Sequence, residues 1–182
     1  MKRLAERTEQ GRPLRVGLIG AGKFGTMFLS QARRIPGLHV LGVADLAPVQ
    51  GRDALQRAGW PQEQITEAGF AKALKEGSTC ITADSEALIK ADGMDVIIES
   101  TGSPSAGIRH SLLSFEHGRH VVMVNVEADA LAGPLLAQRA ASAGVVYSMG
   151  YGDQPALICE LVDWARASGF EVVCAGKGAK YL

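Results

Sequence analysis

A glycine-rich segment near the amino terminus constrains the fold of this 182-residue chain more than any other feature. Residues 20–25 read GAGKFG, which has the spacing GxGxxG, and they directly follow the apolar run Leu14 to Ile19. Behind the glycines, apolar residues recur at three- and four-residue steps, as on one face of a helix. Asp45 follows the last glycine at a spacing of about 20 residues. Strand, glycine loop, helix and acid in this order predict a dinucleotide site.

Each glycine of this motif has a separate expected task. Gly20 permits the tight turn, Gly22 removes the Cβ that would block a pyrophosphate, and Gly25 lets the helix approach the strand. The amino terminus of the helix then offers free N–H groups and partial positive charge to the phosphates. Lys23 and Phe24 belong to the same expected site; Lys23 either adds charge near the phosphates or is a solvated first-turn lysine. The competing interpretation is a glycine loop that serves only the packing of the fold and binds no ligand.

Asp45 is expected at the carboxyl end of the second strand, where it accepts hydrogen bonds from the adenosine ribose hydroxyls and repels a 2′-phosphate. This interpretation favours NAD over NADP. Arg52 lies seven positions later and could reach a 2′-phosphate, so NADP stays open. Asp45 could alternatively cap the helix that starts near Pro48.

Short apolar runs alternate with stretches of helical spacing along the rest of the chain, which predicts parallel βαβ units. The fold class is therefore α/β, with a Rossmann-type doubly wound, mostly parallel sheet and helices on both faces. The predicted strands are 14–19, 38–44, 79–82, 95–100, 120–124, 145–149 and 170–175. The predicted helices run from the glycine motif to Ile35, over 48–58, 67–75 and 85–91, from Ser103 to about His117, through Leu131 to Leu136, and over the periodic set 157–165 after Asp153. Residues 1–13 form a polar extension, and residues 14–182 form the domain.

Two polar loops follow predicted strands at the edge of the sheet where open α/β folds bind ligands. The run Val96 to Ile98 predicts a strand buried on both faces, near the middle of the sheet. The loop Thr101-Gly102-Ser103 follows it and could lie against a nicotinamide ribose, while Ser103 could also cap the next helix. Asn125 leaves the next strand and could orient the nicotinamide end. Glu127 is a substrate ligand or a surface carboxylate.

The composition excludes several classes of function. Lysine plus arginine and aspartate plus glutamate both total 19, so we expect no nucleic-acid or anionic-membrane partner. No apolar run is long enough for a transmembrane helix, and the polar start predicts no signal peptide. The three widely spaced cysteines, Cys80, Cys159 and Cys174, are expected to be small core residues in a reducing, cytoplasmic location, with Cys174 buried in the last strand. The histidines around 110–120 lack partners at ligand spacing, so no metal is expected.

Three segments resemble the homoserine-dehydrogenase-like oxidoreductases: GLIGAGKFG at 17–25, IESTGSP at 98–104 and VMVNVEAD at 122–129. Two later segments, GYGDQPALICELVDWAR and GKGAKY, are similar to the branch that includes the deoxyxylulose-phosphate-reductoisomerase-like proteins, which often carry a SAF domain. The resemblance implies pyrophosphate at the three glycines, ribose at Asp45, nicotinamide at Thr101 to Ser103, and the cofactor–substrate junction at Asn125. Homoserine dehydrogenases usually have a lysine where this chain has Val126, which weakens homoserine as the substrate.

The expected function is an NAD(P)-dependent oxidoreductase that transfers hydride to or from a carbonyl or hydroxyl carbon of a small polar metabolite. Members of the family that this chain resembles are much longer, so we expect the chain to be the catalytically incomplete amino-terminal part of an enzyme. The full-length enzyme is expected to be a homo-oligomer. Lys177 is the candidate for acid–base work or substrate binding, and a solvated lysine is the alternative. A non-catalytic NAD(H)-binding sensor is the rival function, and a Rossmann-like methyltransferase is a weaker one.

Overall fold

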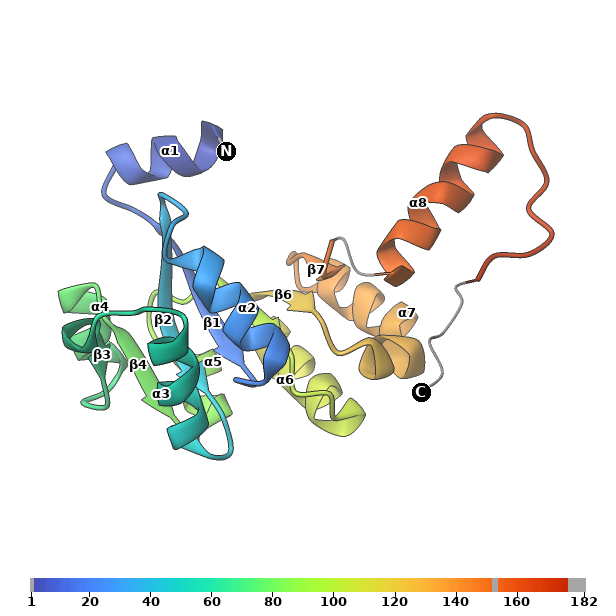
Figure 1. Ribbon diagram of the computed structural model, residues 1–182. Coiled ribbons are helices and arrows are strands. Elements are labelled where there is room, and N and C mark those ends of the chain that lie inside the picture. The colour runs from blue at the N-terminus through green and yellow to red at the C-terminus, as the bar shows by residue number, and fades with distance from the viewer. Residues whose placement is uncertain (1, 152–153, 177–182) are drawn as a thin grey trace.

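The predicted first strand lies at the centre of a seven-stranded sheet in the computed structural model, which describes residues 2–151 and 154–176 (Figure 1). All described strand pairs are parallel, as expected for an α/β Rossmann-type fold. The strand order is β3-β4-β2-β1-β5-β6-β7. The strands are β1 (Leu14–Ile19), β2 (Leu38–Ala44), β3 (Ile65–Thr66), β4 (Thr79–Thr82), β5 (Val96–Glu99), β6 (His120–Met123) and β7 (Tyr147–Met149).

The chain order reverses between β1 and β5, and this position fixes where a ligand site forms. Strands to one side of β1 come from the first part of the chain, and strands beyond β5 come from the second part. The register places Ile19 beside Ala44 on β2 and beside Glu99 on β5, so these three strands end at the same level. In open α/β sheets, ligands bind outside the carboxyl ends of the strands at this switch point.

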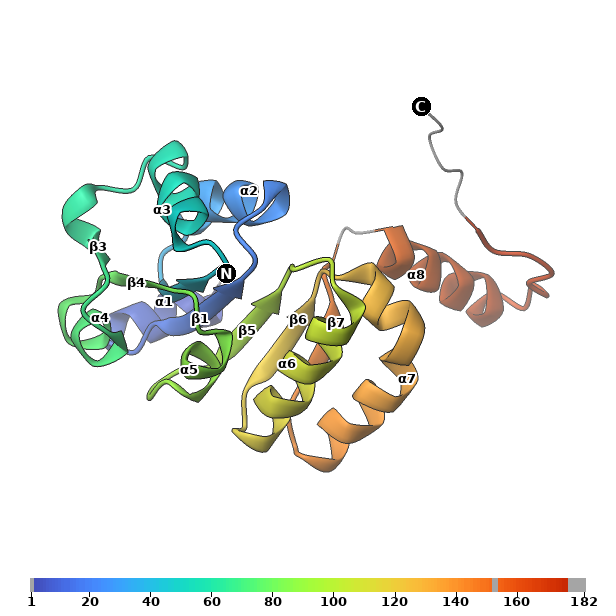
Figure 2. The same ribbon diagram turned by 90° about the horizontal axis from the view of Figure 1, so that it is seen from below.

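Helices cover the sheet from both sides, because the central strands carry apolar residues on both faces. One face packs against α2 (Lys23–Ala32) and α3 (Pro48–Arg57), through Leu29 and Leu55. The other face packs against α4 (Phe70–Glu76), α5 (Ser85–Lys90), α6 (Pro104–Glu116) and α7 (Val126–Ser142). Figure 2 shows the two sets on opposite sides of the sheet. The prediction of a doubly wound sheet is confirmed.

Local signals also placed several helix starts correctly. Asp84 caps α5, because its Oδ1 accepts a hydrogen bond of 2.9 Å from the backbone N–H of Ala87. Pro104 occupies the first turn of α6, where a missing N–H carries no penalty. Ser103 stands at the cap position of α6, but its side chain makes no capping hydrogen bond.

Two elements of the first part of the chain were not predicted. Within the polar extension at residues 1–13, α1 (Lys2–Glu9) forms a helix with no buried residue. It is anchored at one end by Arg7, whose guanidinium lies 3.4 Å from Asp95. The two-residue strand β3, which follows a short 3-10 helix at Gln62–Gln64, was not predicted, because two residues are too few to show an alternating pattern.

The carboxyl-terminal region contradicts another prediction. Residues 170–175 were expected to form a seventh strand, but they have no regular structure, and Cys174 is exposed rather than buried. The preceding helix α8 (Gln154–Ala167) projects beyond β7 in both ribbon views (Figures 1 and 2), so no strand of the sheet lies beside these residues. Cys159 on α8 was also expected in the core and is exposed, whereas Cys80 is buried as predicted.

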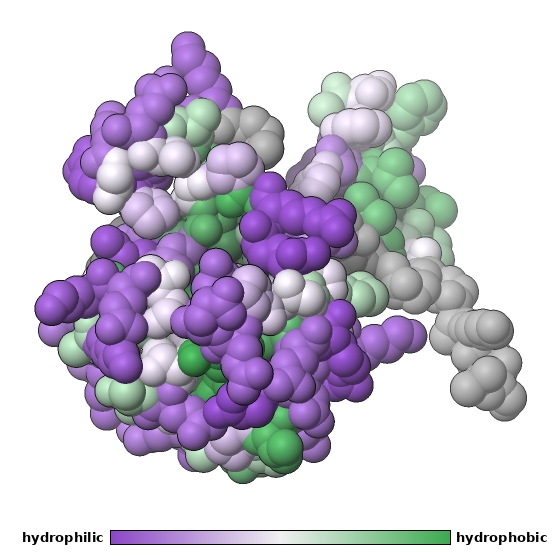
Figure 3. Space-filling view, turned by 60° about the vertical axis from the view of Figure 1, so that its left-hand side comes forward, coloured by the Kyte–Doolittle hydropathy of each residue, from purple (hydrophilic) through white to green (hydrophobic). Residues whose placement is uncertain are grey.

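Apolar side chains are exposed on α8 and on the segment after it. They include Leu157, Leu161, Trp164, Phe170 and Val173. Figure 3 shows hydrophobic residues gathered on the part of the molecule that carries α8 and the segment after it, beside the residues drawn in grey. In the described part of the chain, no helix is long and apolar enough to cross a membrane.

Candidate functional site

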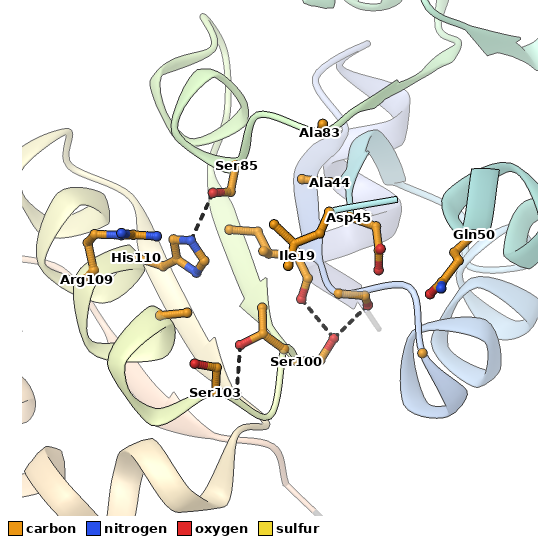
Figure 4. Close-up of a pocket in the computed structure, with 15 residues that line it drawn as sticks. Ile19, Ala44, Asp45, Gln50, Ala83, Ser85, Ser100, Ser103, Arg109 and His110 are labelled. Atoms are coloured by element: carbon orange, nitrogen blue, oxygen red, sulfur yellow. Dashed lines mark hydrogen bonds between the residues drawn. The ribbon is translucent and has the colours of Figure 1, made fainter. Parts of the chain in front are cut away.

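A cavity of about 390 Å³ opens at the carboxyl edge of the sheet, at the switch point between β1 and β5 (Figure 4). This volume lies within the range of small-molecule sites. The cavity is bounded by the loops that follow β1, β2, β4 and β5 and by the first turns of α3, α5 and α6. Its lining residues are Ile19, Gly20, Gly22, Ala44, Asp45, Leu46, Gln50, Ala83, Ser85, Ser100, Thr101, Ser103, Ala106, Arg109 and His110.

The three motif glycines have three different surroundings. Gly20 has a φ of +97°, and a Cβ there would lie 2.7 Å from the backbone oxygen of Ser100. A Cβ on Gly25 would lie 2.5 Å from the backbone oxygen of Gly20, so only glycine lets α2 approach the loop this closely. A Cβ on Gly22 would meet no protein atom within 4 Å, although Gly22 lines the cavity. Two glycines therefore serve the fold, and the third keeps space open.

The carboxylate of Asp45 lies in the same cavity and ties the glycine loop to the end of β2. Its Oδ2 accepts a 2.9 Å hydrogen bond from the backbone N–H of Ala21, and its Oδ1 accepts one of 3.0 Å from Ala47. Ala47, not Asp45, stands at the cap position of α3. Each carboxylate oxygen has two lone pairs, so Asp45 keeps acceptor capacity toward a ligand.

The cations near this cavity are arranged differently from the expectation. Arg52 does not line the cavity, and its guanidinium pairs with the carboxylate of Glu67. Arg109, which the sequence analysis did not single out, lines the cavity from α6. Lys23 and Phe24 are exposed on the first turn of α2 and are not among the lining residues.

The loop between β5 and α6 is held from behind by a buried amide. Thr101 and Ser103 line the cavity, and Gly102 between them is exposed with a φ of +72°. Asn125 is 2% exposed and lies outside the lining. Its Nδ2 donates a 2.8 Å hydrogen bond to the backbone oxygen of Ser103, and its Oδ1 accepts from Ala128 at the start of α7. Asn125 therefore positions the loop rather than facing the cavity.

A buried polar chain next to the cavity was missed at the sequence level. Glu99 is fully buried at the end of β5, and its Oε1 lies 2.6 Å from the hydroxyl of Thr101 and 3.2 Å from Nδ1 of His110. The other ring nitrogen of His110 lies 2.9 Å from the hydroxyl of Ser85. The histidine thus has a carboxylate partner, which the spacing of the residues in the sequence did not indicate. A charged residue at the end of an otherwise apolar strand was the available signal.

The two remaining candidates lie away from this cavity. Glu127 is exposed in the first turn of α7 and is not among the lining residues. Lys177 lies outside the described residues.

Comparisons with known proteins add a sequence match at the end of the chain. Residues 152–182 match the family model described as "Oxidoreductase DRL, catalytic domain". This match falls on the stretch whose later segments resembled one branch of the homoserine-dehydrogenase-like group. A search of curated protein sequences finds no match to the chain.

Several solved structures share the fold at low sequence identity. An NAD-binding oxidoreductase from Klebsiella pneumoniae aligns with a TM-score of 0.58 and 20% identity, covering 86% of this chain and 39% of its own. A homoserine dehydrogenase from Thiobacillus denitrificans aligns with a TM-score of 0.57 and 18% identity, covering 75% and 29%. The myo-inositol dehydrogenase from Lactobacillus casei, solved with NAD(H) and myo-inositol, aligns with a TM-score of 0.59 and 16% identity, covering 84% and 42%.

This chain thus spans less than half the length of these structural neighbours. The alignments show that it shares the α/β Rossmann-type fold found in NAD-binding oxidoreductases.

Proposed function

We propose that this chain is the cofactor-binding domain of an NAD(P)-dependent oxidoreductase. One observation carries the proposal: Gly22 leaves space open in a cavity that also holds Asp45, at the switch point of the sheet. A pyrophosphate needs the missing Cβ at this position, and a ribose needs a nearby carboxylate. A glycine loop that only packs would not leave the second glycine open, since Gly20 and Gly25 already satisfy the packing.

Within this proposal, the chain's own residues bind and orient the cofactor. The first turn of α2 holds the pyrophosphate and Asp45 holds the adenosine ribose. The loop Thr101 to Ser103, held by Asn125, lies at the nicotinamide side. The nicotinamide supplies the hydride chemistry when it is bound.

The substrate in this proposal is a small polar metabolite with a carbonyl or hydroxyl carbon. The match of residues 152–182 to an oxidoreductase family and the homoserine dehydrogenase among the structural neighbours both support this class. Homoserine-type and deoxyxylulose-phosphate-type substrates are the two candidates to test first.

Calorimetric titration of the purified chain with NAD(H) and NADP(H) tests the binding function. We expect saturable one-to-one binding of at least one of these dinucleotides. A chain that is folded by circular dichroism but releases no heat and shows no shift in melting temperature with any of the four would refute the proposal.

Asp45 is expected to set a preference for NAD over NADP. A carboxylate about 4–5 Å from a 2′-phosphate repels it by about 3 kcal/mol before salt screening. Asp45→Asn removes the charge and keeps an acceptor oxygen, so we expect the ratio of the two dissociation constants to narrow by roughly tenfold or more. Asp53→Asn, at an exposed position on α3, serves as the control. Wild-type protein that prefers NADP would show that a cation such as Arg109 outweighs Asp45.

Turnover separates the oxidoreductase from the rival NAD(H)-binding sensor. We expect the 182-residue chain to bind cofactor without oxidising or reducing a substrate, because general acid–base groups, worth roughly 10²–10⁴ in rate, would come from a longer protein. The measurement follows nicotinamide absorbance with deoxyxylulose phosphate and homoserine, for this chain and for a version extended to the full reading frame. Turnover only in the extended version supports the proposal. Robust turnover by the short chain contradicts the incomplete-enzyme account, and none in either favours the sensor.

A further inference from the structure

The polar chain Ser85–His110–Glu99 ends at the wall of the cavity. Ser85 stands in the first turn of α5 and His110 stands on α6, and both line the cavity. Glu99, at the end of β5, is 0% exposed, and His110 is 3% exposed. Figure 4 shows the Ser85 hydroxyl directed to the imidazole, on the opposite side of the cavity from Asp45 and Gln50. Three elements of the fold therefore fix the orientation of one small hydroxyl.

The hydrogen-bond partners within the polar chain Ser85–His110–Glu99 determine which atoms donate. The Glu99 carboxylate offers only lone pairs, and its Oε1 faces both the Thr101 hydroxyl and Nδ1 of His110. Nδ1 of His110 therefore carries the proton, and in a neutral imidazole the other nitrogen, Nε2, is an acceptor. The Ser85 hydroxyl, 2.9 Å away, then donates its one hydrogen to Nε2. Its remaining lone pairs are left for another group, so Ser85 offers the cavity an acceptor.

The position of the cavity relative to Asp45 indicates which part of a dinucleotide meets Ser85. With phosphates at Gly22, ribose at Asp45 and the nicotinamide side at Thr101 to Ser103, the base attached to the Asp45 ribose is expected in the remaining part of the cavity. The cavity lining includes the apolar side chains of Leu46, Ala83 and Ala106, which suit the faces of a flat heterocycle. Ser85 supplies an acceptor at one edge of this space.

We propose that Ser85, held by His110 and Glu99, recognises the exocyclic amino group of adenine by accepting a hydrogen bond from it. This inference rests on the proposed dinucleotide-binding function and adds a specificity-determining residue to that site. Adenine carries an amino donor at this edge, whereas hypoxanthine carries a carbonyl oxygen, which faces the Ser85 lone pairs unfavourably. His110 and Glu99 are positioning residues, since they fix the direction in which Ser85 donates.

The test compares NAD with its deamino analogue, nicotinamide hypoxanthine dinucleotide, by calorimetric titration of the full chain. One neutral hydrogen bond is worth about 0.5–1.5 kcal/mol, so we expect wild-type protein to bind NAD about two- to twelvefold more tightly. Ser85→Ala should weaken NAD binding by a similar factor and leave binding of the analogue within about twofold. Ser85→Thr, which keeps the hydroxyl, should retain the preference. Ser142→Ala, an exposed serine on α7, should change neither value.

The outcomes separate this inference from the function on which it rests. Equal affinity of wild-type protein for both dinucleotides, or an equal loss of both in Ser85→Ala, overturns the role of Ser85 and leaves dinucleotide binding intact. Tighter binding of the deamino analogue would show that Ser85 donates into the cavity, which also overturns the assignment. Binding of neither dinucleotide refutes the proposed function and this inference together.

Discussion

Gly22→Val abolishes dinucleotide binding while the fold persists: this is the largest effect that the structure leads us to expect. The backbone at Gly22 has φ −70° and ψ −157°, which is an extended conformation without the positive φ that would require glycine. The new side chain meets no protein atom at its Cβ and points into space that a pyrophosphate would need. Loss of two charge-assisted hydrogen bonds, at about 1.5–3 kcal/mol each, raises the dissociation constant roughly 100-fold or more.

The measurement pairs calorimetric titration with chemical denaturation. The free energy of unfolding should fall by about 1 kcal/mol or less, because Gly22 caps α2 and valine is a poorer cap. Gly176→Val is the matched control, since that glycine also has open surroundings and no positive φ but lies outside the cavity. Unchanged NAD(H) affinity in Gly22→Val would remove the pyrophosphate from this loop.

Gly25→Ala is expected to give the second largest effect, this time on stability. Its Cβ would lie 2.5 Å from the backbone oxygen of Gly20, so α2 must move away from the loop. Overpacking of this kind costs about 1–3 kcal/mol, and the displaced helix terminus should weaken dinucleotide binding as well.

Urea denaturation monitored by circular dichroism gives the comparison for this pair of variants. Gly22→Ala adds the same methyl group to the same loop without a clash, so it should unfold within about 0.5 kcal/mol of wild type. If Gly25→Ala proves as stable as Gly22→Ala, the close approach of α2 to the loop is not a constraint on this position.

Local patterns in the sequence predicted most of the sheet and five of the fifteen residues that line the cavity, namely Gly20, Gly22, Asp45, Thr101 and Ser103. The strands β1, β2 and β5 are buried on both faces over most of their length, so polar residues are absent from 16–19, 40–44 and 96–98 and the strands are easy to recognise. The glycine loop and Asp45 are joined to these strands by fixed spacing. Parallel strands place their carboxyl ends at one edge, and this topology brought the glycine loop, Asp45 and the loop Thr101 to Ser103 to the same cavity.

The features that were missed depend on contacts between distant elements. Glu99 and His110 come from a strand and a helix, and no local spacing reveals that their side chains meet. The pairing of Arg52 with Glu67 likewise depends on how the segment after α3 folds back. The apolar run 170–175 has the composition of a strand, yet a strand needs a neighbour for its backbone hydrogen bonds, and the sheet offers none there.

A crystal structure of this chain grown with NAD(H) is the sharpest test of the proposed dinucleotide site. We expect the dinucleotide in the cavity at the carboxyl edge of the sheet, with its pyrophosphate against Gly22 and the first turn of α2 and its adenosine ribose hydroxyls on Asp45. A dinucleotide bound elsewhere on the chain, or a cavity that stays empty at saturating NAD(H), would contradict it.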